Sequence, residues 1–170
     1  IAAMALAQIA GATAGEIRNA MLSFGGVDRR FDFHVRRDDM VYISDYAHHP
    51  EEIRQSILSI KQLYNNRRIK AIFQPHLYSR THDFYKEFAD ALSLLDDVVL
   101  LDIYPAREEP IPGVTSKLIY DNLRPGIRKT MCHKQDFLDC VKEKDFDVLV
   151  TLGAGDIENY AKEITDILNN

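Results

Sequence analysis

The stretch from Ile69 to Ile103 reads IKAIFQPHLYSRTHDFYKEFADALSLLDDVVLLDI. It opens with Ile69–Gln74, a short apolar run that is typical of a buried strand. It closes with a second such run, Val98–Ile103, and between the two Thr81–Leu94 places apolar residues at the spacing of one helix face. A strand, a helix and a strand of these lengths predict two parallel strands joined by a crossover helix.

The same alternation continues along most of the chain. Phe31–Arg37 alternates apolar and polar residues, and Met40–Ser44 follows after a short turn, which predicts an antiparallel hairpin. The repeated strand and helix units predict an α/β fold whose mostly parallel sheet is covered by helices on both faces. Outside the stretch quoted above, helices are expected at residues 50–64, 115–123, 135–143 and 157–168, and strands at residues 127–132 and 147–152.

Residues 1–24 depart from this pattern. They predict one helix over residues 2–10 and a second that Thr13 caps, with Glu16 at capping-box spacing, and that Gly25-Gly26 ends. The chain starts with Ile1 inside the first helix rather than with Met. We therefore expect a truncated chain, in which residues 1–24 are the tail of a preceding domain and residues 25–170 form the domain itself.

Composition excludes several classes of protein. The 170 residues are enough for about one domain with a real core, and their net charge of −5 argues against a dedicated nucleic-acid binder. The longest apolar stretch, residues 1–14, is too short to span a membrane. The two cysteines have no CxxC spacing and the chain has no secretory segment, which favours reduced thiols in the cytoplasm, where they would be small core residues.

Ligands of parallel α/β sheets bind at the carboxyl ends of the strands, which selects four loops here. The first runs from Asp45 to Pro50, DYAHHP, and joins a strand to a helix. The Asp45 carboxylate could accept hydrogen bonds from a ribose, and the following helix N-terminus suits an anion. Equally, Asp45 could only cap the loop, and the two histidines could be exposed polar residues.

The second and third loops also carry unusual polar residues. In FQPHLYSRT, residues 73–81, Arg80 could pair with a carboxylate or a phosphate, or could be a surface residue beside a helix that Thr81 caps. Residues 102–113 form a long, proline-rich loop, and long loops at a ligand-binding edge tend to be functional or interfacial. The charges of this third loop could instead simply pair with one another.

The fourth loop, residues 153–156, is less specific. Its Gly153-Ala154-Gly155 lets a backbone approach a ligand closely, but it is not GxGxxG. The alternative is a plain turn with Asp156 as helix cap. Arg29 and Arg30 could meet a phosphate or form a solvated basic face. The sequence has neither a GxxxxGK[ST] phosphate loop nor a GxSxG elbow, and its histidines lack metal-site spacing, so we expect no metal site on this chain.

Five of these strings together resemble the C-terminal domain of the Mur ligases. The Tyr-Pro-Ala-Arg-Glu string favours the branch of that family that adds alanine over the branch that recycles murein tripeptide. Residues 1–24 resemble the helices that close the family's central, ATP-binding domain. In chain order, the strings are Gly26–Phe31, Asp45–Pro50, Phe73–Thr81, Asp102–Glu108 and Leu152–Ile157.

The resemblance implies a three-layer, Rossmann-like domain of an ATP-dependent ligase. Such an enzyme joins L-alanine to UDP-N-acetylmuramate through an acyl phosphate during peptidoglycan synthesis in the cytoplasm, with neither nucleic acid nor membrane as a partner. ATP and Mg²⁺ would be the cofactors, and the missing central domain would hold most of both. The isolated chain would accordingly be inactive, because it would lack the phosphate loop and the UDP-sugar domain.

The resemblance also implies roles for individual residues. By this resemblance, Arg80 would contact the alanine carboxylate, which suits the fork of a guanidinium group. A neutral histidine near the alanine amine could take up a proton. This sequence departs from the family at Leu77, where some members carry an arginine. Two other functions stay open: a stand-alone nucleotide-binding module, and a metal-dependent phosphoesterase that uses the His and Asp loops. The expected ATP contacts are Arg30 and Asp45, the L-alanine contacts Tyr46, His48 and Arg80, and the catalytic residues His48 and His76.

Overall fold

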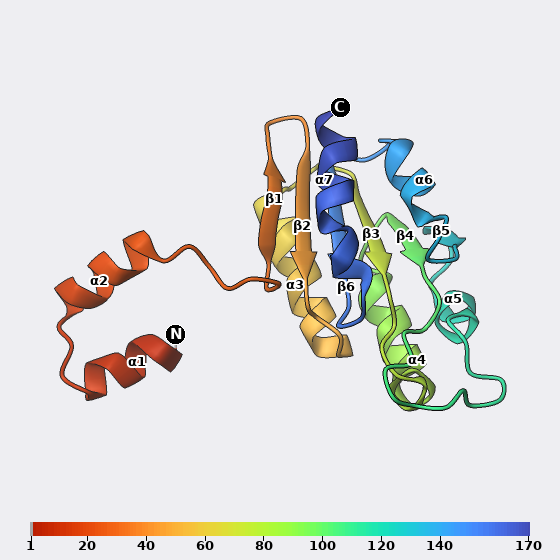
Figure 1. Cartoon of the computed structure of the whole chain (residues 1–170), viewed down its shortest axis with the longest axis horizontal. Coiled ribbons are helices and arrows are strands. Elements are labelled where there is room, and N and C mark those ends of the chain that lie inside the picture. Colours follow the sequence, from red (N-terminus) through yellow and green to blue (C-terminus); the bar gives the residue numbers. More distant parts are fainter. Residues whose placement is uncertain (1) are drawn as a thin grey trace.

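A computed structural model describes residues 2–170 as a sheet with helices packed on both sides (Figure 1). The expectation that Ile1 lies inside a helix therefore falls outside the described residues. The strands are β1 (Asp32–Arg36), β2 (Val41–Asp45), β3 (Ile69–Phe73), β4 (Asp97–Leu100), β5 (Arg128–Met131) and β6 (Val148–Leu152). The helices are α1 (Ala2–Ile9), α2 (Ala14–Ser23), α3 (Pro50–Leu63), α4 (Tyr78–Leu92), α5 (Lys117–Asn122), α6 (Phe137–Lys142), the 3₁₀ helix η1 (Ile157–Tyr160) and α7 (Ala161–Asn169).

The six strands form one sheet in the order β1-β2-β6-β3-β4-β5. Strand β1 pairs antiparallel with β2, and every other pairing is parallel. The last strand of the chain, β6, lies between β2 and β3, so the carboxyl ends of β2, β6, β3 and β4 meet at one edge. This arrangement confirms the α/β fold with an antiparallel hairpin strand.

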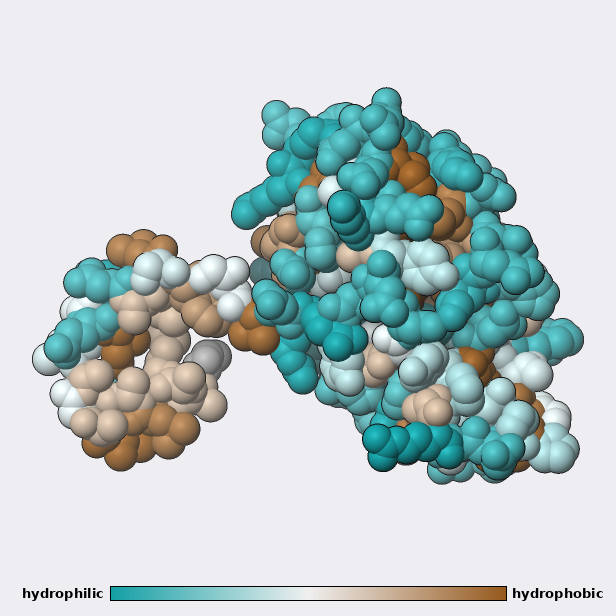
Figure 2. Space-filling view, viewed as in Figure 1, coloured by the Kyte–Doolittle hydropathy of each residue, from teal (hydrophilic) through white to brown (hydrophobic). Residues whose placement is uncertain are grey.

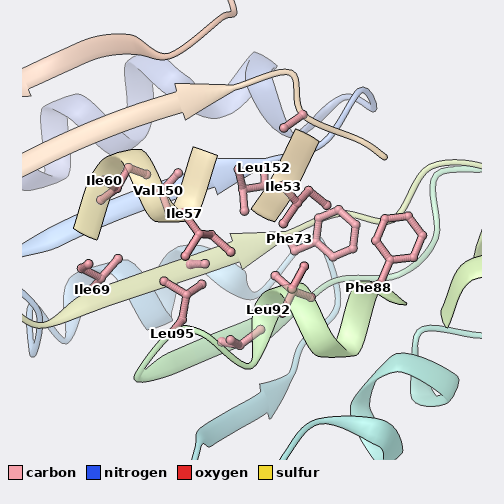
Figure 3. Packing of buried hydrophobic residues seen from close by; sticks show 14 of the residues in the cluster. Ile53, Ile57, Ile60, Ile69, Phe73, Phe88, Leu92, Leu95, Val150 and Leu152 are labelled. Atoms are coloured by element: carbon pink, nitrogen blue, oxygen red, sulfur yellow. The ribbon is translucent and has the colours of Figure 1, made fainter. Parts of the chain in front are cut away.

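Strand periodicity divides the sheet between two cores. Successive side chains of a strand point to opposite faces, so Ala71 and Phe73 enter one core while Ile72 enters the other. Helices α3, α4 and α5 cover the first core and α6 and α7 cover the second. Each fully buried apolar side chain contributes about 1.5–3 kcal/mol. The first core includes Ile53, Ile57, Ile60, Ile69, Phe73, Phe88, Leu92, Leu95, Val150 and Leu152 (Figure 3).

Helix α3 begins as its sequence predicts. Pro50 occupies the first helical position, where its missing N–H costs nothing, and the Glu52 carboxylate accepts hydrogen bonds from the backbone N–H groups of His48 (3.1 Å) and His49 (3.2 Å). The helix buries its expected apolar face from Ile53 onward. Leu63, the last residue of the helix, is 59% exposed.

Helix α4 begins three residues earlier than its sequence suggests. Its first residue is Tyr78, and its N-cap is Leu77, whose φ of 72° lies in the left-handed region. Thr81 is therefore not the N-cap. It lies inside the helix, fully buried, and its Oγ1 donates a hydrogen bond to the Leu77 carbonyl at 2.9 Å. The capping group is instead the Glu108 carboxylate, which reaches the first turn of α4 from the 102–113 loop.

Helices α1 and α2 lie apart from the sheet (Figure 1). The capping box at the start of α2 is confirmed, since Thr13 N–H donates to the Glu16 carboxylate at 2.8 Å and Glu16 N–H donates to Thr13 Oγ1 at 3.3 Å. Neither helix buries a residue, and apolar side chains show on their surface (Figure 2). Within residues 2–170, no helix combines the length and the apolar character that crossing a membrane requires. The large apolar side chains exposed here are Met4, Leu6, Ile9, Met21 and Leu22.

Candidate active site

The four loops selected from the sequence meet at the carboxyl edge of the sheet. Backbone hydrogen bonds join them directly beyond the last paired residues: Gln74 N–H donates to the Leu152 carbonyl at 3.0 Å, and Gly153 N–H donates to the Asp45 carbonyl at 3.2 Å. Residues that are far apart in the chain therefore share one small surface.

Four aromatic rings from three of these loops form a row along this edge. The ring centroids of Tyr46 and His48 lie 5.2 Å apart, those of His48 and His76 lie 6.1 Å apart, and those of His76 and Tyr104 lie 5.7 Å apart. The last two rings are stacked, with 22° between their planes. The structure thus brings together both histidines that the sequence singled out, together with Tyr104, which it did not.

The hydrogen bonds of the two histidines imply opposite tautomers. His48 Nδ1 lies 2.9 Å from the Tyr46 carbonyl, which can only accept, so Nδ1 carries the hydrogen and Nε2 has the lone pair when the ring is neutral. His76 Nδ1 lies 3.4 Å from Arg80 Nη1, which can only donate, so Nδ1 accepts and Nε2 carries the hydrogen. One ring can therefore accept a proton at Nε2 while the other donates a hydrogen bond from it.

The surroundings of His76 favour the neutral form of its imidazole. Burial is the main cause that lowers the pKa of this group, and electrostatic interactions with Arg80 and His48 lower the pKa further. The Glu108 carboxylate opposes them but is the weakest of these influences. A neutral ring retains the lone pair that accepts the Arg80 hydrogen bond.

Arg80 lies in the first turn of α4 and is half-buried. Its contact with His76 uses one of five N–H donors. The ion pairs found within residues 2–170 do not include Arg80, so in this part of the chain no carboxylate neutralises it. The guanidinium has the charge and the donors to take a carboxylate from a ligand.

The segment that joins α2 to the sheet brings both arginines to this edge. The Arg29 carbonyl accepts a hydrogen bond from Tyr46 N–H at 2.7 Å, and the guanidiniums of Arg29 and Arg30 lie 4.8 Å and 5.8 Å from the Tyr46 ring centroid. Arg29 also forms an ion pair with Glu158. The sequence indicates a pair of adjacent arginines here, but it does not predict the contacts of Arg29 with Tyr46 and Glu158.

Asp45 is the last residue of β2 and is half-buried. Its Oδ1 accepts a hydrogen bond from Ala47 N–H at 3.3 Å, and within residues 2–170 no hydrogen bond to Oδ2 is found. A carboxylate for ribose hydroxyls and nearby guanidiniums for phosphate fit the chemistry of a nucleotide. The cavity beside Asp45 measures only about 10 Å³, room for about one water, so it cannot enclose a nucleoside.

The glycine turn after β6 serves packing. A Cβ on Gly153 would stand 2.5 Å from the Gln74 carbonyl oxygen, and a Cβ on Gly155 would strike the Gln74 side chain and stand 2.9 Å from Tyr104 Cβ. The group that approaches these glycines closely is therefore Gln74, which is 2% exposed. Packing against Gln74 explains both glycines without a ligand.

Asp156 occupies the N-cap position of η1, as the alternative interpretation of this turn expects, but its side chain makes no capping hydrogen bond. The Asp156 carboxylate instead accepts hydrogen bonds from Gln74 Nε2 at 2.8 Å and Lys134 Nζ at 2.5 Å. The N–H of Ile157, the first residue of η1, donates to Gln74 Oε1 at 3.0 Å. Gln74 therefore holds both the N-cap residue and the first residue of η1.

The 102–113 loop contains the residues that the sequence reasoning missed. Tyr104 N–H donates to the Pro75 carbonyl at 2.8 Å, and Leu77 N–H donates to the Tyr104 carbonyl at 3.0 Å. The Glu108 carboxylate accepts hydrogen bonds from Ser79. The Pro-rich composition of the loop marked it as a candidate, but nothing local indicated these partners.

Metal ligands do not gather at this edge. Over residues 2–170, no group of three or more His, Cys, Asp or Glu side chains is arranged to hold a metal ion. Asp45, His48 and His76 therefore do not form a ligand set.

Comparisons with known proteins identify the family of this chain. The family model described as "Mur ligase, glutamate ligase domain" matches residues 29–164. The UDP-N-acetylmuramate–L-alanine ligase of Phocaeicola vulgatus is 64% identical over 169 residues, 99% of this chain and 37% of the relative, and that of Parabacteroides distasonis is 51% identical over 99% of this chain and 36% of the relative. The chain thus spans little more than a third of the length of these relatives.

Solved structures lead to the same family. The UDP-N-acetylmuramate-alanine ligase of Thermotoga maritima matches with a TM-score of 0.78 and 29% identity, over 98% of this chain and 36% of that one. A murein peptide ligase of Psychrobacter arcticus shares the fold, with a TM-score of 0.66 and 23% identity, over 99% of this chain and 35% of that one. The family model and the two curated relatives together show that this chain belongs to the Mur ligase family.

Proposed function

We propose that this chain supplies the amino-acid side of the active site in an ATP-dependent ligase that joins L-alanine to UDP-N-acetylmuramate in peptidoglycan synthesis. The observation that carries this proposal is the cluster of Arg80, His48 and His76, in which one arginine without a carboxylate partner among residues 2–170 lies beside two histidines of opposite tautomer. The names of the relatives supply the substrates, and the cluster supplies the chemistry that an α-amino acid needs.

Each end of alanine has a matching group in this cluster. The Arg80 guanidinium binds the carboxylate through parallel N–H donors. His48 Nε2 accepts a proton from the ammonium group, since only the free amine is a nucleophile. His76, held neutral, presents Nε2–H as a hydrogen-bond donor to the negative charge that develops as the amine attacks. Tyr46 lies against His48 and limits the space on that side of the site.

Asp45 and Arg30 would hold the nucleotide. The Asp45 carboxylate suits the ribose hydroxyls, and Arg30, carried over the Tyr46 ring, suits the phosphates. ATP supplies the phosphoryl group that activates the muramoyl carboxylate. By the same family resemblance, Mg²⁺ would be held mainly by the central domain of the longer protein.

The division of the chain is part of the proposal. Residues 1–24 would be the helical tail of a central, ATP-binding domain, and residues 25–170 the C-terminal domain. The exposed apolar side chains of α1 and α2 support this division, because surfaces of that kind are normally covered. The proposed enzyme acts in the cytoplasm on small-molecule substrates, with neither nucleic acid nor membrane as a partner.

The test is ADP formation by the longer protein that contains this chain. With ATP, Mg²⁺ and UDP-N-acetylmuramate present, L-alanine should start ADP release, whereas D-alanine and L-glutamate should not. The 170-residue chain alone should give no turnover. Robust turnover by the isolated chain, or ADP release that does not depend on L-alanine, would overturn the proposal. Tight ATP binding by the chain alone, measured by calorimetry, would favour a nucleotide-binding module instead.

A further inference from the structure

The 102–113 loop is attached to the start of α4 at two points. At the first point, Tyr104 continues the sheet edge: its N–H donates to the Pro75 carbonyl at 2.8 Å and its carbonyl accepts from Leu77 N–H at 3.0 Å. These bonds place the Tyr104 ring on His76. They fix the start of the loop but leave the rest of it, residues 105–113, without a strand partner.

The second attachment is made by Glu108. Its Oε2 accepts a hydrogen bond from Ser79 N–H at 2.9 Å, and its Oε1 accepts one from Ser79 Oγ at 2.5 Å. These bonds hold the pKa of the Glu108 carboxyl below its usual value. Ser79 is the second residue of α4, where backbone N–H groups have no partner within the helix.

Glu108 takes the place of the local N-cap that α4 lacks. The N-cap residue, Leu77, has no side-chain oxygen to offer the first turn. A carboxylate at this position also interacts favourably with the positive end of the helix dipole. The interaction spans 29 residues of sequence, so it determines where the loop lies as well as where the helix begins.

The same turn of α4 carries Arg80, whose guanidinium lies 3.4 Å from His76. Any rotation of this turn displaces Arg80, and it also moves Leu77, whose N–H holds the Tyr104 carbonyl and with it the ring that is stacked on His76. We propose that Glu108 is a positioning residue of the amino-acid site: its carboxylate fastens the 102–113 loop to the first turn of α4, and so holds Tyr104 on His76 and Arg80 in its orientation. The link to alanine binding rests on the proposed function; the mechanical link does not.

The pKa of His76 gives a direct readout in the 170-residue chain. The groups that face His76 are Arg80 from α4, His48 from the β2–α3 loop, and Tyr104 and Glu108 from the 102–113 loop. Burial lowers this pKa most, whereas the Glu108 charge raises it slightly. Loss of the charge alone and loss of the loop contact therefore have opposite effects.

Two substitutions at position 108 separate these effects. In Glu108→Gln, the side-chain carbonyl still accepts from Ser79 while the charge is gone, so the pKa of His76, followed by NMR titration, should fall. In Glu108→Ala, the first turn of α4 should loosen, so that Leu77 no longer holds Tyr104 on His76 and Arg80 moves away; both changes should raise the pKa. Ser79→Ala removes the Oγ bond to Glu108 but keeps the N–H bond, so it should raise the pKa by less. Glu109→Gln, at the neighbouring exposed residue, is the matched control and should leave it unchanged.

The outcomes show whether Glu108 holds the loop against α4 or only lies beside it. If Glu108→Gln and Glu108→Ala lower the pKa of His76 by the same amount, the loop stays in place without Glu108 and the proposal is wrong. Dispersed amide spectra of each variant show that a change is not due to unfolding.

A kinetic arm in the longer protein links the clamp to substrate binding. Glu108→Ala should raise the KM for L-alanine by about tenfold or more, as expected when a binding group is misplaced, with a smaller change in kcat and partial rescue in Glu108→Gln. Equal KM values for wild type and Glu108→Ala would overturn the role in alanine binding. If the wild type shows no alanine-dependent ADP release, the proposed function fails, while the NMR result still decides the clamp.

Discussion

The Arg80 guanidinium lies 3.4 Å from His76 Nδ1, one helical turn along the chain, and can only donate to it. Protonation of His76 would break this contact and place two cations side by side. Replacing Arg80 with glutamine should therefore raise the pKa of His76, which NMR titration of the imidazole carbons would measure. An unchanged or lower pKa would show that the two side chains do not interact in solution.

The same shift predicts how stability depends on pH. The pKa of His76 is lower in the folded chain than the ordinary 6.5 of an unfolded one, so below that pH the unfolded state takes up the proton first. The contribution of His76 is fully present above about pH 6.5 and is lost as the pH falls toward its folded pKa. Urea unfolding at pH 7.5 and 5.5 should show a smaller loss of stability in His76→Gln than in wild type. Equal losses would contradict the assignment.

Gly155 offers a test of packing at the site edge. A Cβ there would strike the Gln74 side chain, so Gly155→Ala should destabilise the fold by about 1–3 kcal/mol through overpacking. Gly25→Ala is the matched control, because a Cβ at Gly25 meets nothing within 4 Å. It should change the free energy of unfolding by less than about 0.5 kcal/mol. Equal stabilities of the two variants would mean that Gln74 moves away freely.

Lys70 tests the buried charges at the opposite edge of the sheet. Lys70 is 2% exposed, and its ammonium lies 2.6 Å from Asp145, 3.4 Å from Asp97 and 3.5 Å from Glu143. In Lys70→Ala, Arg128 remains as a cation for these partly exposed carboxylates, but the lost side chain leaves a cavity, which should cost about 2–5 kcal/mol in chemical denaturation. Lys70→Met keeps most of the side-chain volume and should cost less. A loss under about 1 kcal/mol for Lys70→Ala would show that the site collapses around Arg128.

Helices α1 and α2 should respond locally to loss of their cap. Thr13→Ala removes both hydrogen bonds between Thr13 Oγ1 and Glu16 and should weaken α2 by about 1 kcal/mol. Hydrogen exchange should then speed up in α2, with no change in the sheet, because α2 buries no residue. Slower exchange throughout the core of Thr13→Ala, or faster exchange there, would contradict the separation of α2 from the sheet.

Much of the fold could be predicted because local patterns and packing agree. The buried strands β3, β4 and β6 are short apolar runs, and α3 has a proline start and an apolar face from Ile53 to Ile60. The start of α4 could not be predicted, since Thr81 looks like a cap while the real partner, Glu108, lies 29 residues beyond Ser79. Capping rules consider only residues close in sequence, so they select Thr81 rather than Glu108.

The site could likewise be predicted only in part. His48, His76 and Arg80 stand out in strand-end loops, and the common edge of parallel strands brings such loops together. The positions of Tyr104 and Glu108 depend on the path of an irregular loop, which composition does not determine. The role of Gln74 depends on a glycine turn at the far end of the chain, so no pattern around residue 74 indicates it.

The proposed role of this chain is tested most directly by steady-state kinetics of Arg80→Ala in the longer protein, with L-alanine and UDP-N-acetylmuramate varied in turn. Loss of a charge-assisted contact worth about 1.5–3 kcal/mol should raise the KM for L-alanine by about 10- to 100-fold. The KM for UDP-N-acetylmuramate should stay within about twofold, because the proposal assigns this substrate to another domain of the longer protein. An equal rise in both KM values would contradict the assignment of Arg80 to the alanine carboxylate.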